Sequence, residues 1–161
     1  GKAEGKLRTY KLSEEGLHTE EYVLENRMSY GRRLLCAIRT GSCPLRVETG
    51  RLLNPPLPWK DRICWCCGEG VEDERHLVVD CRYYAEERMG MLARLDERLG
   101  GVVKFVQLLD SQPKILFKLL VGGTNQIKRS QGLRIVQSFL VKAMMKRRRF
   151  CEEAGIMARE L

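Results

Sequence analysis

Apolar residues recur at helical spacing along several stretches of the chain. Between Ser29, a suitable N-cap, and Gly41, the residues Leu34, Leu35 and Ile38 form one helical stripe. A second stripe runs through residues 83–101, ends at two consecutive glycines, and comprises Tyr84, Met91, Leu92, Leu95 and Leu99. Both stretches are therefore predicted to be helices.

The C-terminal part of the chain shows the same periodicity. Two short apolar segments, 102–110 and 113–123, meet at Ser111, and Pro113 suits the first turn of a helix. A long amphipathic helix is predicted over about 131–153, ending near Gly155. Its apolar stripe comprises Leu133, Val136, Leu140, Ala143 and Met144.

Other segments interrupt this helical pattern. The first 28 residues are polar and weakly periodic, and the NPPLP segment at 54–58 breaks regular structure. Alternation of period two is not convincing anywhere outside a cysteine-rich segment at 63–81. The sequence therefore predicts a mainly α protein whose helices flank one small irregular or β-hairpin module.

Length and composition narrow the class of protein. A chain of 161 residues with 43% hydrophobic and 31% charged residues can form a single modest core, and it is too short for a multidomain enzyme. Its apolar runs are far shorter than the roughly 20 residues that span a bilayer, so no membrane association is expected. The start has neither an initiator Met nor a signal peptide, and we expect the chain to be the tail of something longer.

Cysteine usage points to a metal site. The seven cysteines are an odd number, and four of them lie between residues 64 and 81, which suits a disulfide framework poorly. The spacing Cys64-x2-Cys67-x8-His76-x4-Cys81 supplies four soft or borderline ligands, the set that structural zinc prefers. Gly68 suits the tight turn behind the second thiolate. One structural Zn²⁺ is therefore predicted, in a reducing compartment.

Adjacent cysteines bind one ion awkwardly, so the neighbouring Cys66 is predicted to be a packed side chain or an exposed thiol rather than a ligand.

The energetics of folding this segment favour the metal as well. Ordering the 18 residues 64–81 costs about 25 kcal/mol. Burying the five strongly apolar side chains in that segment returns about 10 kcal/mol, and a structural zinc adds about 10–16 kcal/mol.

The helical pattern and the cysteine cluster together divide the sequence into three predicted regions. These are an N-terminal helical region (1–60), a zinc-knuckle module (61–90) and a C-terminal helical, basic region (91–161).

Charge is unevenly distributed. The net charge of +8 is the sum of +4 over residues 1–63, −4 over 64–100 and +8 over 101–161. Such a basic end favours a polyanion partner, RNA or DNA. The alternative interpretation is that the basic face serves only solubility. The candidate phosphate-binding residues are Lys142, Lys146, Arg147, Arg148, Arg149, Lys128, Arg129, Arg32 and Arg33. Trp65 either stacks on unpaired bases or covers the zinc site.

Residues 39–51 and 62–88 resemble the zinc-binding region that follows the reverse transcriptase domain in polyproteins of non-LTR (LINE-type) retrotransposons. The motif residues that carry the resemblance are Arg39, Thr40, Gly41, Leu45, Glu48, Thr49, Gly50, Arg51, Cys64, Cys67, Glu72, Asp73, Glu74, His76, Cys81, Tyr84 and Arg88. The resemblance covers about residues 30–90. It implies association with nucleic acid and with the reverse transcriptase domain of the same polyprotein, helping to engage template RNA or target DNA. An intracellular location, nuclear or nucleocytoplasmic, follows from that implication.

Catalytic chemistry is not expected of this chain itself. Its five aspartates are isolated from one another, whereas a polymerase needs a cluster to hold two metal ions. Of its two histidines, His76 is assigned to the metal, which leaves only His18 as a general base. The alternative to nucleic-acid binding is a zinc-stabilised helical module that docks on the polymerase or on another protein.

Overall fold

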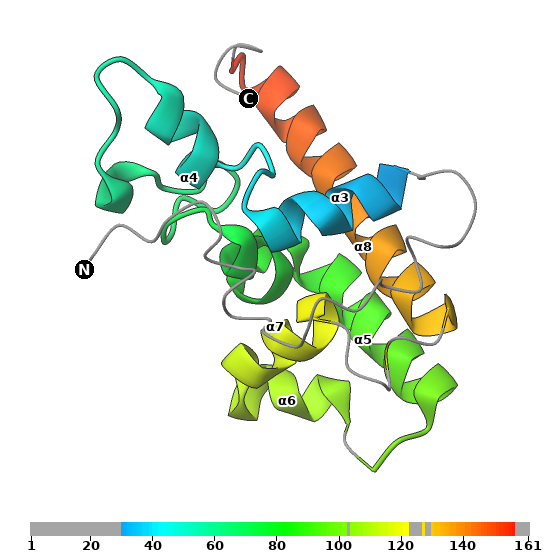
Figure 1. The fold of residues 1–161 in the computed structure, drawn as a ribbon. Coiled ribbons are helices and arrows are strands. Elements are labelled where there is room, and N and C mark those ends of the chain that lie inside the picture. Colours follow the sequence, from blue (N-terminus) through cyan, green and yellow to red (C-terminus); the bar gives the residue numbers. More distant parts are fainter. Residues whose placement is uncertain (1–29, 103, 123–126, 128–129, 157–161) are drawn as a thin grey trace.

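The computed structural model describes residues 30–102, 104–122, 127 and 130–156, and these are mainly helical (Figure 1). The predicted mainly α class is confirmed. The predictions made for the first 28 residues, and Ser29 as an N-cap, lie outside the described residues. Among the described helices, none is long and apolar enough to cross a bilayer.

The predicted helices form close to their expected bounds. They are α3 (Tyr30–Thr40), α5 (Ala85–Leu99), α6 (Phe105–Ser111), α7 (Pro113–Gly122) and α8 (Ser130–Glu153). Pro113 begins α7 as predicted. The apolar stripes of α3 and α8 are buried throughout, and so is that of α5 apart from the half-buried Leu99, which confirms the helical periodicity found in the sequence.

Helix α8 is the central packing element, and it contacts both α3 and α5 (Figure 1). Helices α6 and α7 pack on each other, α6 contacts α5, and α7 contacts α3. Gly31 allows α3 to approach α8 closely, since a Cβ at that position would lie 2.9 Å from the Cβ of Gln137. The packing therefore depends on a small residue at this crossing as well as on apolar stripes.

Between α3 and α5 the chain forms short, irregular elements. These are α4 (Arg46–Thr49), the 3-10 turns η1 (Gly50–Leu52) and η2 (Trp59–Asp61), the π-helical turn η3 (His76–Asp80) and the 3-10 turn η4 (Arg82–Tyr84). In the cysteine-rich segment, the only β pairing among described residues is one antiparallel bridge between Ile63 and Val71. Buried residues from all three predicted regions join one continuous apolar cluster.

Candidate metal centre

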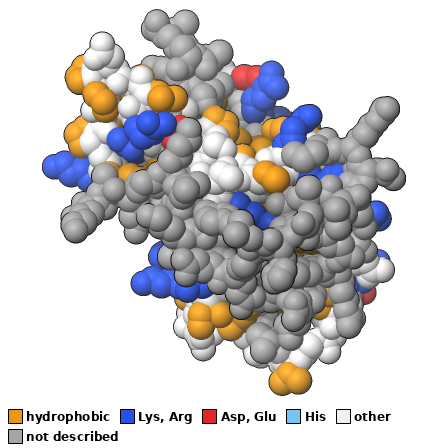
Figure 2. Space-filling model, in the orientation of Figure 1, with side chains coloured by type: hydrophobic (Ala, Val, Ile, Leu, Met, Phe, Trp, Pro, Cys, Tyr) orange, Lys and Arg blue, Asp and Glu red, His pale blue; other side chains and the backbone are white. Residues whose placement is uncertain are grey.

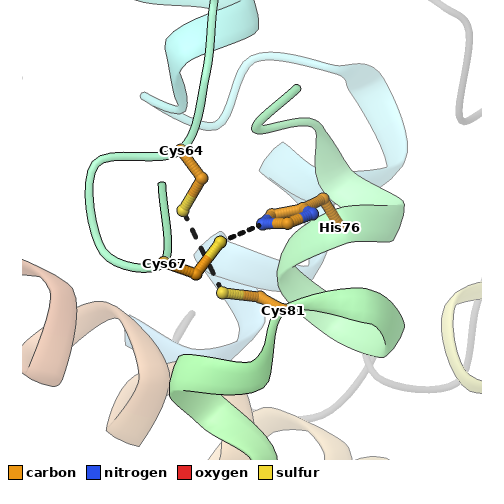
Figure 3. A group of neighbouring side chains, drawn as sticks. All are labelled: Cys64, Cys67, His76 and Cys81. Carbon is orange, nitrogen blue, oxygen red and sulfur yellow. Dashed lines mark hydrogen bonds between the residues drawn. The ribbon is translucent and has the colours of Figure 1, made fainter. Parts of the chain in front are cut away.

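The four predicted metal ligands converge. Their ligand atoms all lie within 4.8 Å of one another, and all four side chains are buried. The Sγ atoms of Cys64 and Cys81 are 4.0 Å apart, and Cys67 Sγ lies 3.3 Å from His76 Nε2. Figure 3 shows the four side chains pointing toward a common centre, two from a loop and two from a helical turn. This cluster could hold one metal ion.

A tight loop presents the first two ligands. The Gly68 amide donates to the Cys64 carbonyl (2.9 Å), and the Glu69 amide donates to Cys67 Sγ (3.3 Å). The Cys64 amide closes the loop by donating to the Gly70 carbonyl (3.0 Å). Gly68 has a φ of +68°, which confirms the tight turn predicted behind the second thiolate. The backbone therefore points both thiols toward the same side.

A π-helical turn presents the other two ligands. In an α-helix, side chains five residues apart diverge by about 140°, so His76 and Cys81 would face different directions. Here the Cys81 amide donates to the His76 carbonyl (2.7 Å), an i to i+5 bond that widens the turn. The Asp73 carboxylate accepts from the His76 amide (2.8 Å) and caps the start of the turn. The His-x4-Cys spacing is thus matched to a π turn.

Buried polar groups fix the C-terminal end of that turn. Arg88 is buried, and its guanidinium donates to the carbonyl oxygens of Val78 (2.8 Å) and Cys81 (2.7 Å). Burial lowers the pKa of Arg88, and nearby negative charge opposes this effect. Arg88 thus supplies side-chain donors to carbonyls at the end of the turn, one of which, that of Cys81, also accepts from the Tyr84 amide (3.3 Å).

Burial and hydrogen bonds shift the pKa values within the cluster in different directions, and only the shift at Cys64 favours the metal-binding form. Hydrogen bonds with Cys66 and then Cys81 lower the pKa of the Cys64 thiol, and burial opposes them. Burial raises the pKa of the Cys67 thiol. The pKa of His76 is raised, because a hydrogen bond with Cys64 and neighbouring negative charge together outweigh burial. A metal ion would replace these shared protons, since thiolate and neutral imidazole are the binding forms.

A buried ion pair lies directly behind Cys64. Glu72 Oε1 is 3.8 Å from Cys64 Sγ, and Arg147 of α8 donates to both carboxylate oxygens of Glu72 (2.8 and 2.9 Å). Both side chains are at most 3% exposed. The Glu72 carboxylate also accepts from the Arg46 amide (2.8 Å). Glu72 therefore joins the cysteine loop to the start of α4 and to α8.

Arg147 corrects a sequence prediction. The prediction that Arg147 reaches phosphates is wrong, because its side chain is buried and its guanidinium is bound to Glu72. The neighbouring Lys146 is half-buried, and its ammonium is held by Glu87 (2.9 Å) and by the Tyr83 carbonyl (2.9 Å). A helix turns by about 100° per residue, so consecutive basic residues cannot share one face.

The remaining candidate basic residues have different surroundings. Lys142, Arg148 and Arg149 are exposed on α8, where Arg148 pairs with Glu152 (2.9 Å). On α3, Arg33 is exposed and Arg32 is half-buried. Lys128 and Arg129 lie outside the described residues.

The two remaining side chains of interest in the cysteine-rich segment are engaged within the fold. The Trp65 ring is half-buried and packs against the guanidinium groups of Arg46 (4.4 Å to the ring centroid) and Arg147 (5.5 Å). Cys66 is also half-buried, and its Sγ accepts from the hydroxyl of the buried Tyr84 (3.3 Å). Cys66 is a packed thiol outside the ligand cluster, one of the two roles that the sequence left open.

The sequence reasoning missed the residues that support the ligands. Glu72 lies in an acidic run, but nothing in a single sequence pairs it with Arg147, 75 positions away. The position of Asp73 three residues before His76 is the one local signal, because it matches the spacing of an N-cap. Comparison with protein-family models, curated proteins and solved structures gave no match.

Proposed function

We propose that this chain is a zinc-stabilised, non-catalytic module that binds RNA or DNA. We further propose that it belongs to the C-terminal region of a retrotransposon-type reverse transcriptase polyprotein, inside the cell, in the nucleus or moving between nucleus and cytoplasm. The observation that carries the proposal is the convergence of Cys64, Cys67, His76 and Cys81 on one buried centre.

Zinc suits this donor set best. Three thiolates and an imidazole are soft to borderline ligands, and a tetrahedral zinc ion places such atoms about 3.5–3.8 Å apart. The separations of 3.3 and 4.0 Å lie close to that range, and no two of the four ligand atoms are more than 4.8 Å apart. Four protein ligands complete a tetrahedral shell and leave no position for a reacting water. The proposed role of the metal is therefore structural.

Lys142 and Arg149 support a phosphate-binding surface. Both are exposed, and seven residues along a helix return nearly to the same face, about 10 Å further along the axis. This α8 stripe (Lys142 and Arg149) lies on the helix whose buried side carries Arg147, so the metal module and the stripe are rigidly connected. Phosphate contacts of this kind supply affinity that is independent of base sequence.

The decisive experiment measures nucleic-acid binding as a function of salt. Labelled single-stranded RNA and duplex DNA are titrated with the zinc-loaded chain and with a Lys142→Gln/Arg149→Gln variant. Each phosphate contact contributes a log-log slope of roughly −0.9 on duplex DNA and −0.7 on single strands. Removing two contacts should reduce the slope by roughly 1.8 or 1.4, respectively.

A Lys114→Gln/Lys118→Gln variant is the matched control, because it removes the same charge from two exposed positions on α7. It should leave the slope unchanged if the α8 stripe binds phosphates. Equal losses in both variants would indicate a diffuse charge effect and contradict the stripe. Absence of binding by the zinc-loaded wild-type chain would refute the nucleic-acid function.

One observation favours a second function, that of a protein-interaction module. The loop at residues 52–58 exposes several apolar side chains on the surface of the molecule. Such a module would show zinc-dependent folding with no salt-dependent affinity for nucleic acid. The titration above separates the two functions directly.

A further inference from the structure

A groove lies between helices α5 and α8, which run antiparallel side by side (Figure 1). Its volume is about 270 Å³, slightly below the roughly 300–1,000 Å³ of sites that hold drug-sized molecules. The floor is apolar and is formed by Met91, Ile135 and Phe139, each at most 5% exposed. The groove therefore suits one small group that has an apolar face.

Gly90 leaves the space of this groove unfilled. It lies inside α5, where glycine is less favourable than alanine, and its φ is not positive. A Cβ at this position would have no neighbouring atom within 4 Å, so close packing does not require a glycine here. Gly90 also lines the groove and is exposed. A larger side chain at position 90 would therefore occupy the groove without disturbing the packing of α5 on α8.

Basic side chains lie at the two ends of the groove. In the antiparallel arrangement the start of α5 meets the later part of α8, so Lys142 lies at the end near Glu86, and Arg94 lies at the opposite end. Both basic side chains are exposed. Arg149 lies about 10 Å beyond Lys142 along α8. Arg94, the groove, Lys142 and Arg149 therefore follow one another along the helix axis.

The charges around the groove favour a ligand that carries phosphates. Among the described residues of the face drawn in Figure 2, basic side chains predominate over acidic ones, in line with the net charge of +8. Of the two acidic side chains that line the groove, Glu87 is paired with Lys146 (2.9 Å). Glu86 is exposed, and a glutamate carboxylate accepts a hydrogen bond from the amino group of a base such as cytosine.

An unpaired nucleotide combines the groups that match these features. Proteins that bind single strands combine a positively charged groove that follows the phosphates with side chains against which the bases pack. Here the apolar floor lies between two basic side chains, as a base lies between the phosphates on its two sides. A base that is paired and stacked within a duplex is not available to such a groove.

We infer that the groove between α5 and α8 holds an unpaired base of a single-stranded nucleic acid, an assignment that rests on the nucleic-acid function proposed above. The base lies over Met91 and Phe139, with its amino edge toward Glu86. The phosphates on its two sides bind Lys142 and Arg94. Because Lys142 also belongs to the α8 stripe, one strand follows the stripe and places a base in the groove.

Filling the groove with Gly90→Leu tests this site. Fluorescence anisotropy measures binding of the zinc-loaded chain to a short strand of deoxycytidines, to an abasic strand of the same length and to duplex DNA. The wild type should bind the deoxycytidine strand at least fivefold more tightly than the abasic strand. Gly90→Leu should lose that advantage and bind duplex DNA as the wild type does. Ala85→Leu, at an exposed position of α5 outside the groove, is the matched control and should keep the advantage.

Two further variants test the rim of the groove. The wild type should bind deoxycytidine strands severalfold more tightly than deoxyuridine strands, because uracil has an oxygen in place of the amino group, and Glu86→Ala should abolish this preference. Arg94→Gln should reduce the log-log salt slope on the deoxycytidine strand by roughly 0.7. Glu97→Ala and Lys114→Gln, at exposed positions outside the groove, are the matched controls and should change neither value.

Zinc content and helical circular dichroism of each variant establish that it is folded. If Gly90→Leu binds the deoxycytidine strand as tightly as the wild type, the groove is left to a side chain of a partner protein and the base site is overturned, while the phosphate contacts of the α8 stripe stand. Equal binding of the abasic strand by the wild type overturns the site in the same way. If Gly90→Leu does not fold, a preference for deoxycytidine that survives in Glu86→Ala overturns it. Absence of any nucleic-acid binding by the wild type refutes both the site and the function on which it rests.

Discussion

The cysteine-rich segment and helix α8 reach their structures by different means. Residues 63–81 contain one β bridge, two glycines with positive φ and a π turn, and they converge on four ligand atoms. Helix α8 is 24 residues long and buries a regular apolar stripe against α3 and α5. The helix follows from periodicity, whereas the segment depends on specific side chains that satisfy an otherwise irregular backbone.

The two regions meet at the Glu72–Arg147 pair. This contact means that at least one residue of the basic run in α8 stabilises the fold and does not belong to a charged surface. Four consecutive basic residues, 146–149, have four different environments in the structure. Arg147 is buried against Glu72, Lys146 is held by Glu87, and Arg148 pairs with Glu152, while Arg149 is exposed. A charge cluster in sequence is therefore not one surface, because part of it stabilises the fold.

The largest expected effect comes from removing the proposed zinc ion. Chelation of the zinc-loaded chain at pH 7, or the Cys64→Ser substitution, should unfold residues 63–81 while α8 keeps most of its helicity. Structural zinc contributes about 10–16 kcal/mol in small sites. Apolar burial in this segment supplies only about 10 kcal/mol, which does not offset the cost of ordering it. Amide resonances of the segment and helical circular dichroism measure the two regions separately.

Cys66→Ser is the matched control, since it removes a neighbouring thiol that is not in the ligand cluster. It should retain about one zinc per chain and the native resonances. If Cys64→Ser also retains one zinc and the native fold, the assigned centre is wrong. If chelation unfolds both regions together, α8 does not hold its structure independently of the cysteine-rich segment, and the molecule is one cooperative unit.

A smaller effect is expected at the contact between the two regions. Arg147→Met leaves the Glu72 carboxylate buried without its guanidinium partner, which costs about 3–5 kcal/mol in the free energy of unfolding. Arg148→Met removes an arginine that is 77% exposed, and it should cost less than about 1 kcal/mol. Urea denaturation of the two variants checks this difference, and equal costs would contradict a joining role for Arg147.

The same contrast explains what could be predicted from the sequence. The stripe from Leu133 to Met144 encodes α8 locally, and the Cys-x2-Cys and His-x4-Cys spacings identify the four residues that converge, so the helix and the cluster were predicted correctly. The π turn was not predicted, because the sequence indicated an irregular or β-hairpin module over this stretch and a single π-helical turn leaves no periodic signal. The Glu72–Arg147 pair joins residues 75 apart in sequence, and only the packing of α8 brings them together. Long-range polar contacts leave no periodic signal in a single chain.

The smallest expected effect concerns Lys146, the other basic residue that links α8 to the rest of the fold. The hydrogen bond and charge of Lys146 lower the pKa of Glu87, and partial burial opposes this shift. A lowered pKa means that the ionised carboxylate stabilises the folded state above its unfolded pKa of about 4.3, and that this stability is lost as the pH falls through the folded value. Glu87→Gln should therefore cost about 0.5–1 kcal/mol at pH 7 and 5, and progressively less below pH 4.

The carboxyl titration of Glu87, followed by ¹³C resonances, tests this directly. Its midpoint should lie below about 4.3 in the wild type and rise toward that value in Lys146→Met. Arg94→Met is the control, because it removes an exposed positive charge from α5 itself while leaving the Lys146–Glu87 contact in place. A midpoint unchanged by Lys146→Met would mean that Lys146 makes no ionic link between α8 and α5. Arg147 would then be the basic residue of the 146–149 run that fastens this helix to the rest of the fold, and Lys146 would be free to contribute to the phosphate-binding surface.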